Sequence, residues 1–370
     1  MLKEQTKEVF EEEIIDETMY EEKEEKKPKK KLSLWRRIII VFLIMFIIGL
    51  STLGFLLYGP YSGFRDWLIT SAMTTLNHQW LATIWYSDET IADVLANNRV
   101  IEPDQDTDAN LINVKLFKEP QIFANEYEEA ILIKDPKHDD YKIIDIEGDG
   151  YYGYLVAIYD PKKLKVCYTS RLGVAGQYVT TMAKDHNAQL AINGGGFVDP
   201  NYSSAGGVPQ GTIISGGKIV WEKSYRKSGG LIGIDSDGKL ILTSNTSGQK
   251  ALNMGIQEAV TFGPFLIVNG ESSKVLGNGG WGLAPRTAIG QRADGIMLLL
   301  VLNGRTLKYP GADMDDLIKI MERYGAINAA NLDGGTSSVL VVDGELVNDP
   351  IDGDGRHQTR QIATGIYLEQ

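Results

Sequence analysis

The chain has 370 residues, of which 43% are hydrophobic and 23% charged, so it can bury an ordinary core in one large or two medium domains. Its net charge of -12 excludes the broad basic face that a nucleic-acid-binding protein needs. The only cysteine, Cys167, excludes an internal disulfide. It lies in a strand-like stretch, where we expect a buried and inert thiol.

Residues 1–34 are rich in Glu and Lys and contain few apolar groups. Such a segment buries too little apolar surface to offset the entropy cost of ordering. We therefore predict a disordered, charged tail. Its basic residues gather at the end, from Lys26 to Arg37, next to the apolar stretch that follows.

Residues 35–58 are predicted to form a transmembrane helix. The stretch from Ile38 to Tyr58 has no charged residue, and at about 1.5 Å per residue it reaches roughly 31 Å, enough to cross a bilayer core. A cleavable signal peptide is the alternative, but the apolar run is too long and no small-x-small site follows it. Because basic residues precede the helix, we expect a cytoplasmic N-terminus and an extracellular C-terminal domain at the plasma membrane.

Residues 59–110 are predicted to form a helical juxtamembrane segment and a linker. Apolar residues recur at helical spacing from Phe64 to Tyr86, and a shorter helix is expected after Ser87-Asp88. His78 has no partner at metal-ligand spacing, so we interpret it as a surface or packed histidine. The polar stretch 99–110 contains three alternating aspartates, but it lacks the glycine and glutamate of a calcium-binding EF-hand loop.

The body, residues 111–370, consists of short apolar runs separated by glycine turns. Two-residue turns predict four β-hairpins, at Gly216-Gly217, Asp237-Gly238, Asn269-Gly270 and Asp343-Gly344. The continuous apolar run 295–302 predicts a strand that is buried on both faces.

One helix of the body is well specified by its ends. Asp313 is a suitable N-cap, the next two aspartates load the first turn with negative charge, and Gly325 supplies the C-terminal stop. Its apolar stripe is formed by Leu317, Ile320, Met321 and Tyr324. We therefore predict the α+β class: a hairpin-rich, mixed β-sheet body with a few packed helices, preceded by the transmembrane helix and the helical juxtamembrane segment.

Five segments of the body place glycines, small residues or a lone arginine in strand-like surroundings, namely 191–197, 261–266, 283–290, 329–340 and 360–366. Arg286 and Arg360 each stand in an apolar run. A buried, unpaired charge is costly, so each arginine either pairs with a carboxylate or faces a wet cleft. Guanidinium groups and the bare N–H groups of glycine turns both bind phosphate oxygens. Together with Asp333 at a strand end, the five segments predict a site for an anionic ligand.

These segments, in this order, resemble the phosphodiester glycosidase family. The motifs that carry the resemblance are Asn193-Gly194-Gly195-Gly196-Phe197, Gly263-Pro264-Phe265-Leu266, Pro285-Arg286-Thr287-Ala288-Ile289-Gly290, Asn331-Leu332-Asp333-Gly334-Gly335 with Ser337-Ser338, and Arg360 with Ile362-Ala363-Thr364. The resemblance covers about residues 150–370. It points to the uncovering-enzyme type and to membrane-anchored bacterial members that are linked to exopolysaccharides.

The resemblance implies an extracytoplasmic hydrolase that cleaves a sugar-1-phosphodiester in a cell-surface glycan, an exopolysaccharide or a teichoic-type polymer. The implied catalytic residues are Asp333, Arg286 and Asn193. The implied substrate-binding residues are Arg360, Gly194, Gly195, Gly334, Gly335, Ser337, Asn303 and Arg305. We expect no metal and no cofactor, with a calcium ion at Asp352 and Asp354 as a weaker alternative. The expected partners are a phosphorylated glycan and, through residues 35–58, the membrane, but no nucleic acid.

The chain departs from the family pattern at Asn303-Gly304-Arg305, where relatives usually have Asp-Gly-Arg. Glycoside cleavage usually needs two carboxylates. Besides Asp333, the candidates are Asp199 and Asp313, each of which also suits a turn or a cap. His357 lies in a Gly/Asp loop, where we expect it to be solvated. Two alternatives stay open: a non-catalytic module that binds or scaffolds anionic glycan in cell-envelope polysaccharide assembly, and a phosphotransferase.

Overall fold

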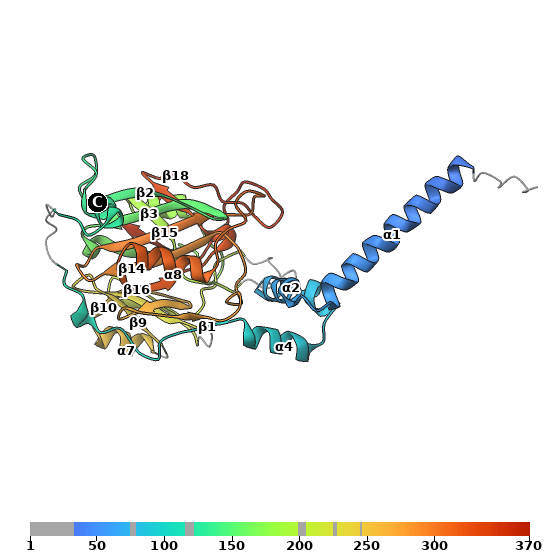
Figure 1. The fold of residues 1–370 in the computed structure, drawn as a ribbon. Helices are drawn as coiled ribbons and strands as arrows, with labels where there is room; N and C mark the ends of the chain where they lie inside the picture. Colours follow the sequence, from blue (N-terminus) through green and yellow to red (C-terminus); the bar gives the residue numbers. More distant parts are fainter. Residues whose placement is uncertain (1–32, 75–78, 115–121, 199–204, 225–227, 245) are drawn as a thin grey trace, which may run out of the picture. The chain divides into compact units, whose positions relative to one another are not determined.

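The computed structural model describes residues 33–370 except 75–78, 115–121, 199–204, 225–227 and 245 (Figure 1). The chain divides into two units, with the boundary between Gly59 and Pro60. The predicted disordered tail lies almost wholly outside the described residues, and so do His78 and Asp199.

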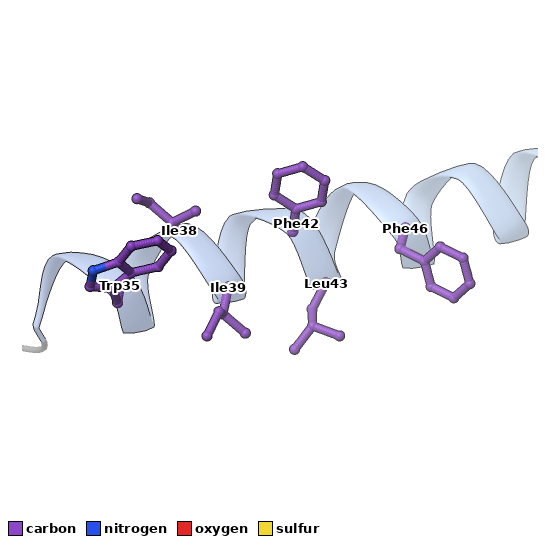
Figure 2. Close-up of a pocket in the computed structure, with 6 residues that line it drawn as sticks. All are labelled: Trp35, Ile38, Ile39, Phe42, Leu43 and Phe46. Atoms are coloured by element: carbon purple, nitrogen blue, oxygen red, sulfur yellow. The ribbon is translucent and has the colours of Figure 1, made fainter.

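The first unit contains one helix, α1 (Leu34–Tyr58), which is long and apolar enough to cross a membrane. A signal sequence near the N-terminus can have the same length and apolar composition. Figure 2 shows six side chains that project from its first turns and line a hollow on the helix surface: Trp35, Ile38, Ile39, Phe42, Leu43 and Phe46. Since every lining residue is apolar and belongs to α1, this hollow has no group that can bind or cleave a phosphodiester.

The second unit begins with three helices, α2 (Ser62–Thr74), α3 (Trp80–Thr83) and α4 (Asp88–Asn97). They share a small core of Ile69, Ala72, Ala82, Ile91 and Val94. As predicted, α4 starts after Ser87, whose hydroxyl accepts the N–H of Thr90 at 3.2 Å.

The stretch 99–110, predicted as a linker, is built into the body. Within it, β1 (Val100–Ile101) pairs with β13 (Lys274–Val275). The carboxylate of Glu102 accepts the N–H groups of Gly229 and Phe265 at 3.0 and 3.2 Å, and burial raises the pKa of this group. A flexible linker would not make such contacts, because a half-buried carboxylate with two backbone donors is fixed in place.

Three larger sheets form the rest of the body. The first has the order β12-β11-β16-β14-β15-β3-β2, the second β18-β17-β5-β19-β4, and the third β7-β6-β10-β8-β9. The strands of the first are β2 (Tyr141–Gly148), β3 (Tyr151–Ile158), β11 (Phe265–Val268), β12 (Glu271–Ser272), β14 (Arg286–Arg292), β15 (Met297–Asn303) and β16 (Ala326–Asn331). The second sheet contains β4 (Leu164–Tyr168), β5 (Leu190–Asn193), β17 (Leu340–Val342), β18 (Glu345–Leu346) and β19 (Thr364–Leu368). The third contains β6 (Thr212–Ser215), β7 (Lys218–Glu222), β8 (Gly230–Asp235), β9 (Leu240–Thr243) and β10 (Ile256–Phe262).

Four more α-helices cover these sheets: α5 (Glu126–Leu132), α6 (Val179–Asp185), α7 (Gly248–Asn253) and α8 (Met314–Arg323). Short 3-10 turns lie at η1 (Ala109–Leu111), η2 (Pro161–Lys163) and η4 (Gly335–Ser337). The α+β class is confirmed, with antiparallel pairing throughout the ladders between named strands.

The seven-stranded sheet is the central layer, and β15 shows why. Every residue of β15 is buried, which confirms the prediction from its continuous apolar run. Met297, Leu299 and Val301 join the core shared with strands of the other two sheets. Leu298, Leu300 and Leu302 join the core beneath α5 and α8, and Figure 1 shows α8 lying across β14 and β16.

All four predicted hairpins are present. The turns join β6 to β7, β8 to β9, β11 to β12 and β17 to β18. In the turns Asn269-Gly270 and Asp343-Gly344 both residues have positive φ, which only Gly, Asn and Asp adopt readily. Cys167 is fully buried, and burial raises its pKa to about 12, so the expectation of an inert thiol is confirmed.

Helix α8 begins as predicted, with Asp313 as N-cap, and Gly325 follows its end with φ 80°. The side chain of Asp313 accepts the N–H of Asp316, and the side chain of Asp316 accepts the N–H of Asp313. Burial raises the pKa of Asp316 to about 6, and the neighbouring Asp313 contributes to this rise.

Because this folded-state pKa lies above the unfolded value, the stabilising contribution of Asp316 is complete at low pH and is lost as pH rises through about 6. We expect the free energy of unfolding to fall by about 1 kcal/mol more in the wild type than in Asp316→Asn between pH ~4 and ~7, after allowing for solvent screening. Urea unfolding of both proteins at pH values between ~4 and ~7 measures this change in the free energy of unfolding. The matched control is Asp315→Asn, whose carboxylate pairs with Lys319. Parallel curves for wild type and Asp316→Asn would contradict the assignment.

Candidate active site

Strand register brings three of the five predicted segments, 261–266, 283–290 and 329–340, to one edge of the central sheet. Arg286, the first residue of β14, pairs with Leu302 near the end of β15. Ala288 pairs with Asn331 at the end of β16, and Phe265 at the start of β11 pairs with Ala330. Because neighbouring strands run antiparallel, these starts and ends share one edge, and the turn after β16 continues directly into Asp333.

The edge of the second sheet meets this edge through Asn193, the last residue of β5. Its Nδ2 donates to the carbonyl of Asp333 at 2.5 Å, and its Oδ1 accepts from Thr287 Oγ1 at 2.7 Å and from the N–H of Val339 at 3.2 Å. Asn193 is fully buried. A side chain so enclosed fixes the backbone of Asp333 without reaching a ligand, so we interpret Asn193 as a positioning residue.

We expect Asn193→Ala to lower the free energy of unfolding by about 3 kcal/mol, because three buried hydrogen-bonding groups lose their partner. Denaturant unfolding measures the change. An exposed asparagine, Asn253 of α7, provides the control, for which we expect a change below about 0.5 kcal/mol on replacement by alanine. A similar small change for Asn193→Ala would show that the two sheet edges are held by other contacts.

The glycines that follow Asn193 do not present bare N–H groups to a cleft. Gly194 N–H donates to the carbonyl of Thr364 at 2.9 Å, and Gly195 N–H donates to its hydroxyl at 3.0 Å. A methyl group would stand 2.7 Å from Thr364 Oγ1 on Gly194 and 2.7 Å from the carbonyl of Thr261 on Gly195. Close packing of neighbouring backbone therefore explains both glycines, and not the ligand contact that we expected from the sequence.

The turn after Asp333 does retain bare main chain. The N–H of Asp333 donates to Gly194 O at 3.2 Å, and that of Gly335 donates to Pro285 O at 2.8 Å. Within the part of the chain that the structure describes, the N–H groups of Gly334 and Thr336 donate no hydrogen bond. Residues 333–336 are half-buried, so this turn is partly open to solvent, and N–H groups without a partner in such a turn suit an anion.

Arg286 lies beside this turn, and only 4% of its surface is exposed. Its Nε donates to Ala312 O at 3.0 Å, and its Nη2 donates to Trp281 O at 2.8 Å and to Gly282 O at 2.5 Å. Among the described residues, no carboxylate lies within ion-pair distance of it, and Nη1 donates no hydrogen bond. A methyl group on Gly334 would stand 3.8 Å from Nη1, so this nitrogen faces the turn after Asp333.

The electrostatics of Arg286 suit an anionic ligand. Burial lowers its pKa to about 10, a shift that Asp313 opposes and Arg305 reinforces. The guanidinium therefore stays charged at neutral pH, and carbonyl dipoles stabilise it in place of a carboxylate. The alternative of a structural arginine–carboxylate pair is wrong for this residue, and a bound phosphate would supply the missing negative charge.

Aromatic rings lie beside both Arg286 and Arg360, the arginine of the fifth segment. Trp281 lies 5.9 Å from the guanidinium of Arg286 and packs edge-on against Phe262, with 6.1 Å between ring centroids. Arg360 is half-buried and lies over the ring of Phe197 at 4.7 Å, at the end of the glycine turn after Asn193. Arg360 thus belongs to the same edge as Asn193 and Asp333.

Asn303 and Arg305 lie on the other side of the turn. The guanidinium of Arg305 donates from Nη1 to Thr336 Oγ1 and to Ile351 O, each at 2.7 Å. The Oδ1 of Asn303 accepts from Asn348 Nδ2 and from Asp349 N at 3.1 Å, whereas its buried Nδ2 has no partner in the described structure. Ser337 is buried, with 3% of its surface exposed.

Asp313 and Asp352, two carboxylates that the sequence suggested for the site, have structural partners. A third carboxylate near the site, Asp349, was not among the predicted residues. Asp313 caps α8, and Asp352 accepts the N–H groups of Asp354 and Arg356 within its own loop. The described residues contain no group of three metal-ligating side chains. Asp349, whose N–H is bound by Asn303, approaches Nδ1 of the exposed His357 at 2.7 Å. The sequence Asn348-Asp349-Pro350, which is typical of a turn, could have indicated an exposed carboxylate at this position.

Comparison with known proteins agrees with this geometry. Residues 186–369 match the family described as phosphodiester glycosidase, and the matched range includes Asn193, Arg286, Asp333 and Arg360. Residues 186–369 thus form the phosphodiester glycosidase domain that this family model describes.

Among individual proteins, the chain is similar to mouse N-acetylglucosamine-1-phosphodiester alpha-N-acetylglucosaminidase, with 25% identity over 232 residues that cover 56% of this chain and 43% of the mouse protein. It is 42% identical over 69 residues to the uncharacterized SPbeta prophage-derived protein YomE of Bacillus subtilis strain 168, which covers 19% of this chain and 11% of YomE. The chain therefore spans less than half the length of either relative.

The fold matches the catalytic domain of the zebrafish N-acetylglucosamine-1-phosphodiester alpha-N-acetylglucosaminidase, whose solved form is auto-inhibited by its pro-peptide. The TM-score is 0.53 at 24% identity, and the match covers 64% of this chain and 86% of the zebrafish chain.

Proposed function

We propose that this chain is a hydrolase that cleaves a sugar-1-phosphodiester bond in a cell-surface glycan, an exopolysaccharide or a teichoic-type polymer. The observation that carries the proposal is the environment of Arg286. This buried cation has no carboxylate partner among the described residues, and its Nη1 faces the bare turn that follows Asp333.

In the proposed reaction, water attacks the anomeric carbon of the sugar and the bond from that carbon to the phosphate oxygen breaks. The products are a free sugar and a phosphate monoester, and the proton released by water balances the charge of the leaving group. Arg286 Nη1 and the N–H groups of Gly334 and Thr336 stabilise the departing phosphate. Arg360 and Arg305 add positive charge on the two sides.

The chemistry of the leaving group explains how one carboxylate is sufficient. A phosphate monoester has a second pKa near 6, so it leaves as an anion without protonation by a strong acid. Glycosidases that expel a sugar hydroxyl need a general acid for this step. Asp333 then has a single role, as the base that orients the attacking water and accepts its proton. The proposed reaction uses no metal or cofactor.

We place this reaction outside the cell. The apolar helix α1 would anchor the chain as a single pass in the plasma membrane, and the basic residues before it favour a cytoplasmic N-terminus. The body would then face cell-envelope polymers as its substrate, with no role for nucleic acid.

The test uses the full chain purified in detergent, with a methyl diester of N-acetylglucosamine-1-phosphate and a UDP-sugar as probes. Release of free sugar is measured for wild type, Asp333→Ala and Arg286→Ala. Water labelled with the heavy oxygen isotope should place the label on the sugar, because the carbon–oxygen bond breaks. Label on phosphate, or equal activity in all three proteins, would refute the proposed reaction.

The rival function is a non-catalytic module that binds anionic glycan. Asn303 favours it, because an amide stands where relatives usually have a carboxylate, and its Nδ2 is buried without a partner in the described structure. Tight polymer binding without turnover, and gain of turnover in Asn303→Asp, would support this rival. Transfer of the sugar phosphate to an added acceptor would instead support a phosphotransferase.

A further inference from the structure

The loop from Leu276 to Gly282 precedes the active-site strand β14 and contributes to the site. Four of its residues are glycines with positive φ: Gly277, Gly279, Gly280 and Gly282, at 57°, 73°, 76° and 59°. This backbone path brings the carbonyls of Trp281 and Gly282 to Nη2 of Arg286. Two of the three hydrogen bonds that orient the guanidinium therefore come from this loop.

The juxtamembrane helices hold the loop in place through Asn278. Its Nδ2 donates to Oγ1 of Thr70, a fully buried residue of α2, at 2.8 Å. Its N–H donates to Oδ1 of Asn98, at the end of α4, at 3.0 Å. Asn98 is itself buried and fixed by a bond from Nδ2 to Val94 O at 2.8 Å.

The loop packs closely against the helices at two of its glycines. A methyl group on Gly282 would stand 2.8 Å from Oγ of Ser71 in α2, and one on Gly280 would collide with the carbonyl of Asn98. Leu276 N–H also donates to Arg99 O at 2.9 Å. These contacts fix the loop relative to α2 and α4. Because the loop carbonyls orient the guanidinium of Arg286, they also fix the direction of that group.

We propose that Thr70, Asn98 and Asn278 are positioning residues for the reaction, and that α2 and α4 belong to the catalytic unit. This inference depends on the proposed function, since it assigns these residues to the orientation of Arg286 toward a phosphate. No carboxylate among the described residues holds the guanidinium, so its direction follows the loop carbonyls. Displacement of a reacting group by about 1 Å costs on the order of 100-fold in rate.

The experiment compares Asn98→Ala with Asn97→Ala in the full chain. The two residues are neighbours at the end of α4, but Asn97 is exposed, and among the described residues its side chain bonds only to Asp93 O. We expect Asn98→Ala to lower kcat/KM for the sugar-1-phosphodiester by about 30-fold and Asn97→Ala to lower it less than about 2-fold. Thr70→Val should lose activity, and Thr70→Ser, which keeps the hydroxyl, should recover most of it.

Inhibition separates positioning from general damage. If Asn98 acts through Arg286, inorganic phosphate should inhibit Asn98→Ala about 10-fold less strongly, whereas the neutral free sugar should inhibit both proteins alike. Equal weakening of both inhibitors, or equal behaviour of the Asn97 and Asn98 variants, would overturn the inference. If the wild type itself turns over no substrate, the proposed function fails. Calorimetric binding of phosphate to the same variants then tests the positioning role separately.

Discussion

Replacing Asp333 with asparagine is expected to lower kcat for a sugar-1-phosphodiester by about three orders of magnitude, the range found for loss of a positioned general base. The amide keeps the size of the side chain but cannot accept a proton from water. The backbone of residue 333 is held by Gly194 and Asn193, and the substitution leaves both contacts in place. KM should change little, because the phosphate is bound by other groups.

The control for this variant is Asp343→Asn, in the hairpin turn between β17 and β18. Asparagine tolerates its φ of 50°, so fold and activity should be unchanged. Steady-state kinetics and thermal unfolding of wild type, Asp333→Asn and Asp343→Asn test this prediction. If Asp333→Asn keeps more than about a tenth of the wild-type kcat, the carboxylate is not the base and Asp349 becomes the next candidate.

Replacing Arg286 with lysine is expected to lower kcat/KM by about 100-fold although the charge is conserved. Lysine offers a point charge on a flexible stem, whereas arginine has a planar fork with fixed donors. In the wild type Nε and Nη2 engage three carbonyls and direct Nη1 toward Gly334. Lysine cannot satisfy these carbonyls and reach the phosphate at once, so we also expect a loss of about 2 kcal/mol in stability.

The matched control lies on the same strand. Arg292, at the far end of β14, forms an ion pair with Asp294 at 2.8 Å, and a lysine at this position keeps the positive charge near that carboxylate, away from the anion site. We expect Arg292→Lys to keep wild-type kcat/KM within about 2-fold. Inhibition by inorganic phosphate should weaken in Arg286→Lys but not in Arg292→Lys. Unchanged phosphate inhibition in Arg286→Lys would remove this residue from the anion site.

The elements that the sequence predicted correctly are those whose signal is local. Helix α8 is defined by a cap, a stripe and a stop within thirteen residues, Asp313 to Gly325. The hairpins are defined by their turn pairs, and β15 is defined by an unbroken apolar run. In each case, residues close in the chain carry the physical cause.

The parts of the site that could not be predicted depend on distant partners. Gly194 and Gly195 suggested an open anion cradle, but the reason for both is close packing against Thr364 and Thr261. Asn278 is separated from Thr70 by 208 positions and from Asn98 by 180, so no local pattern indicates that they meet. The sequence supports no prediction for the glycines at 277–282, because their role depends on the position of Arg286.

The incorporation of residues 99–110 into the body has a consequence for the separation of the body from α1. A protease that cuts between Tyr58 and Ser62, the end of α1 and the start of α2, would release a unit with every support of the site intact. A cut after Asp104 would instead place β1 and Glu102 on the N-terminal fragment, so that no peptide bond would join them to β13 and to the two backbone donors of the body. Limited proteolysis should therefore yield an active fragment in the first case and an unstable one in the second.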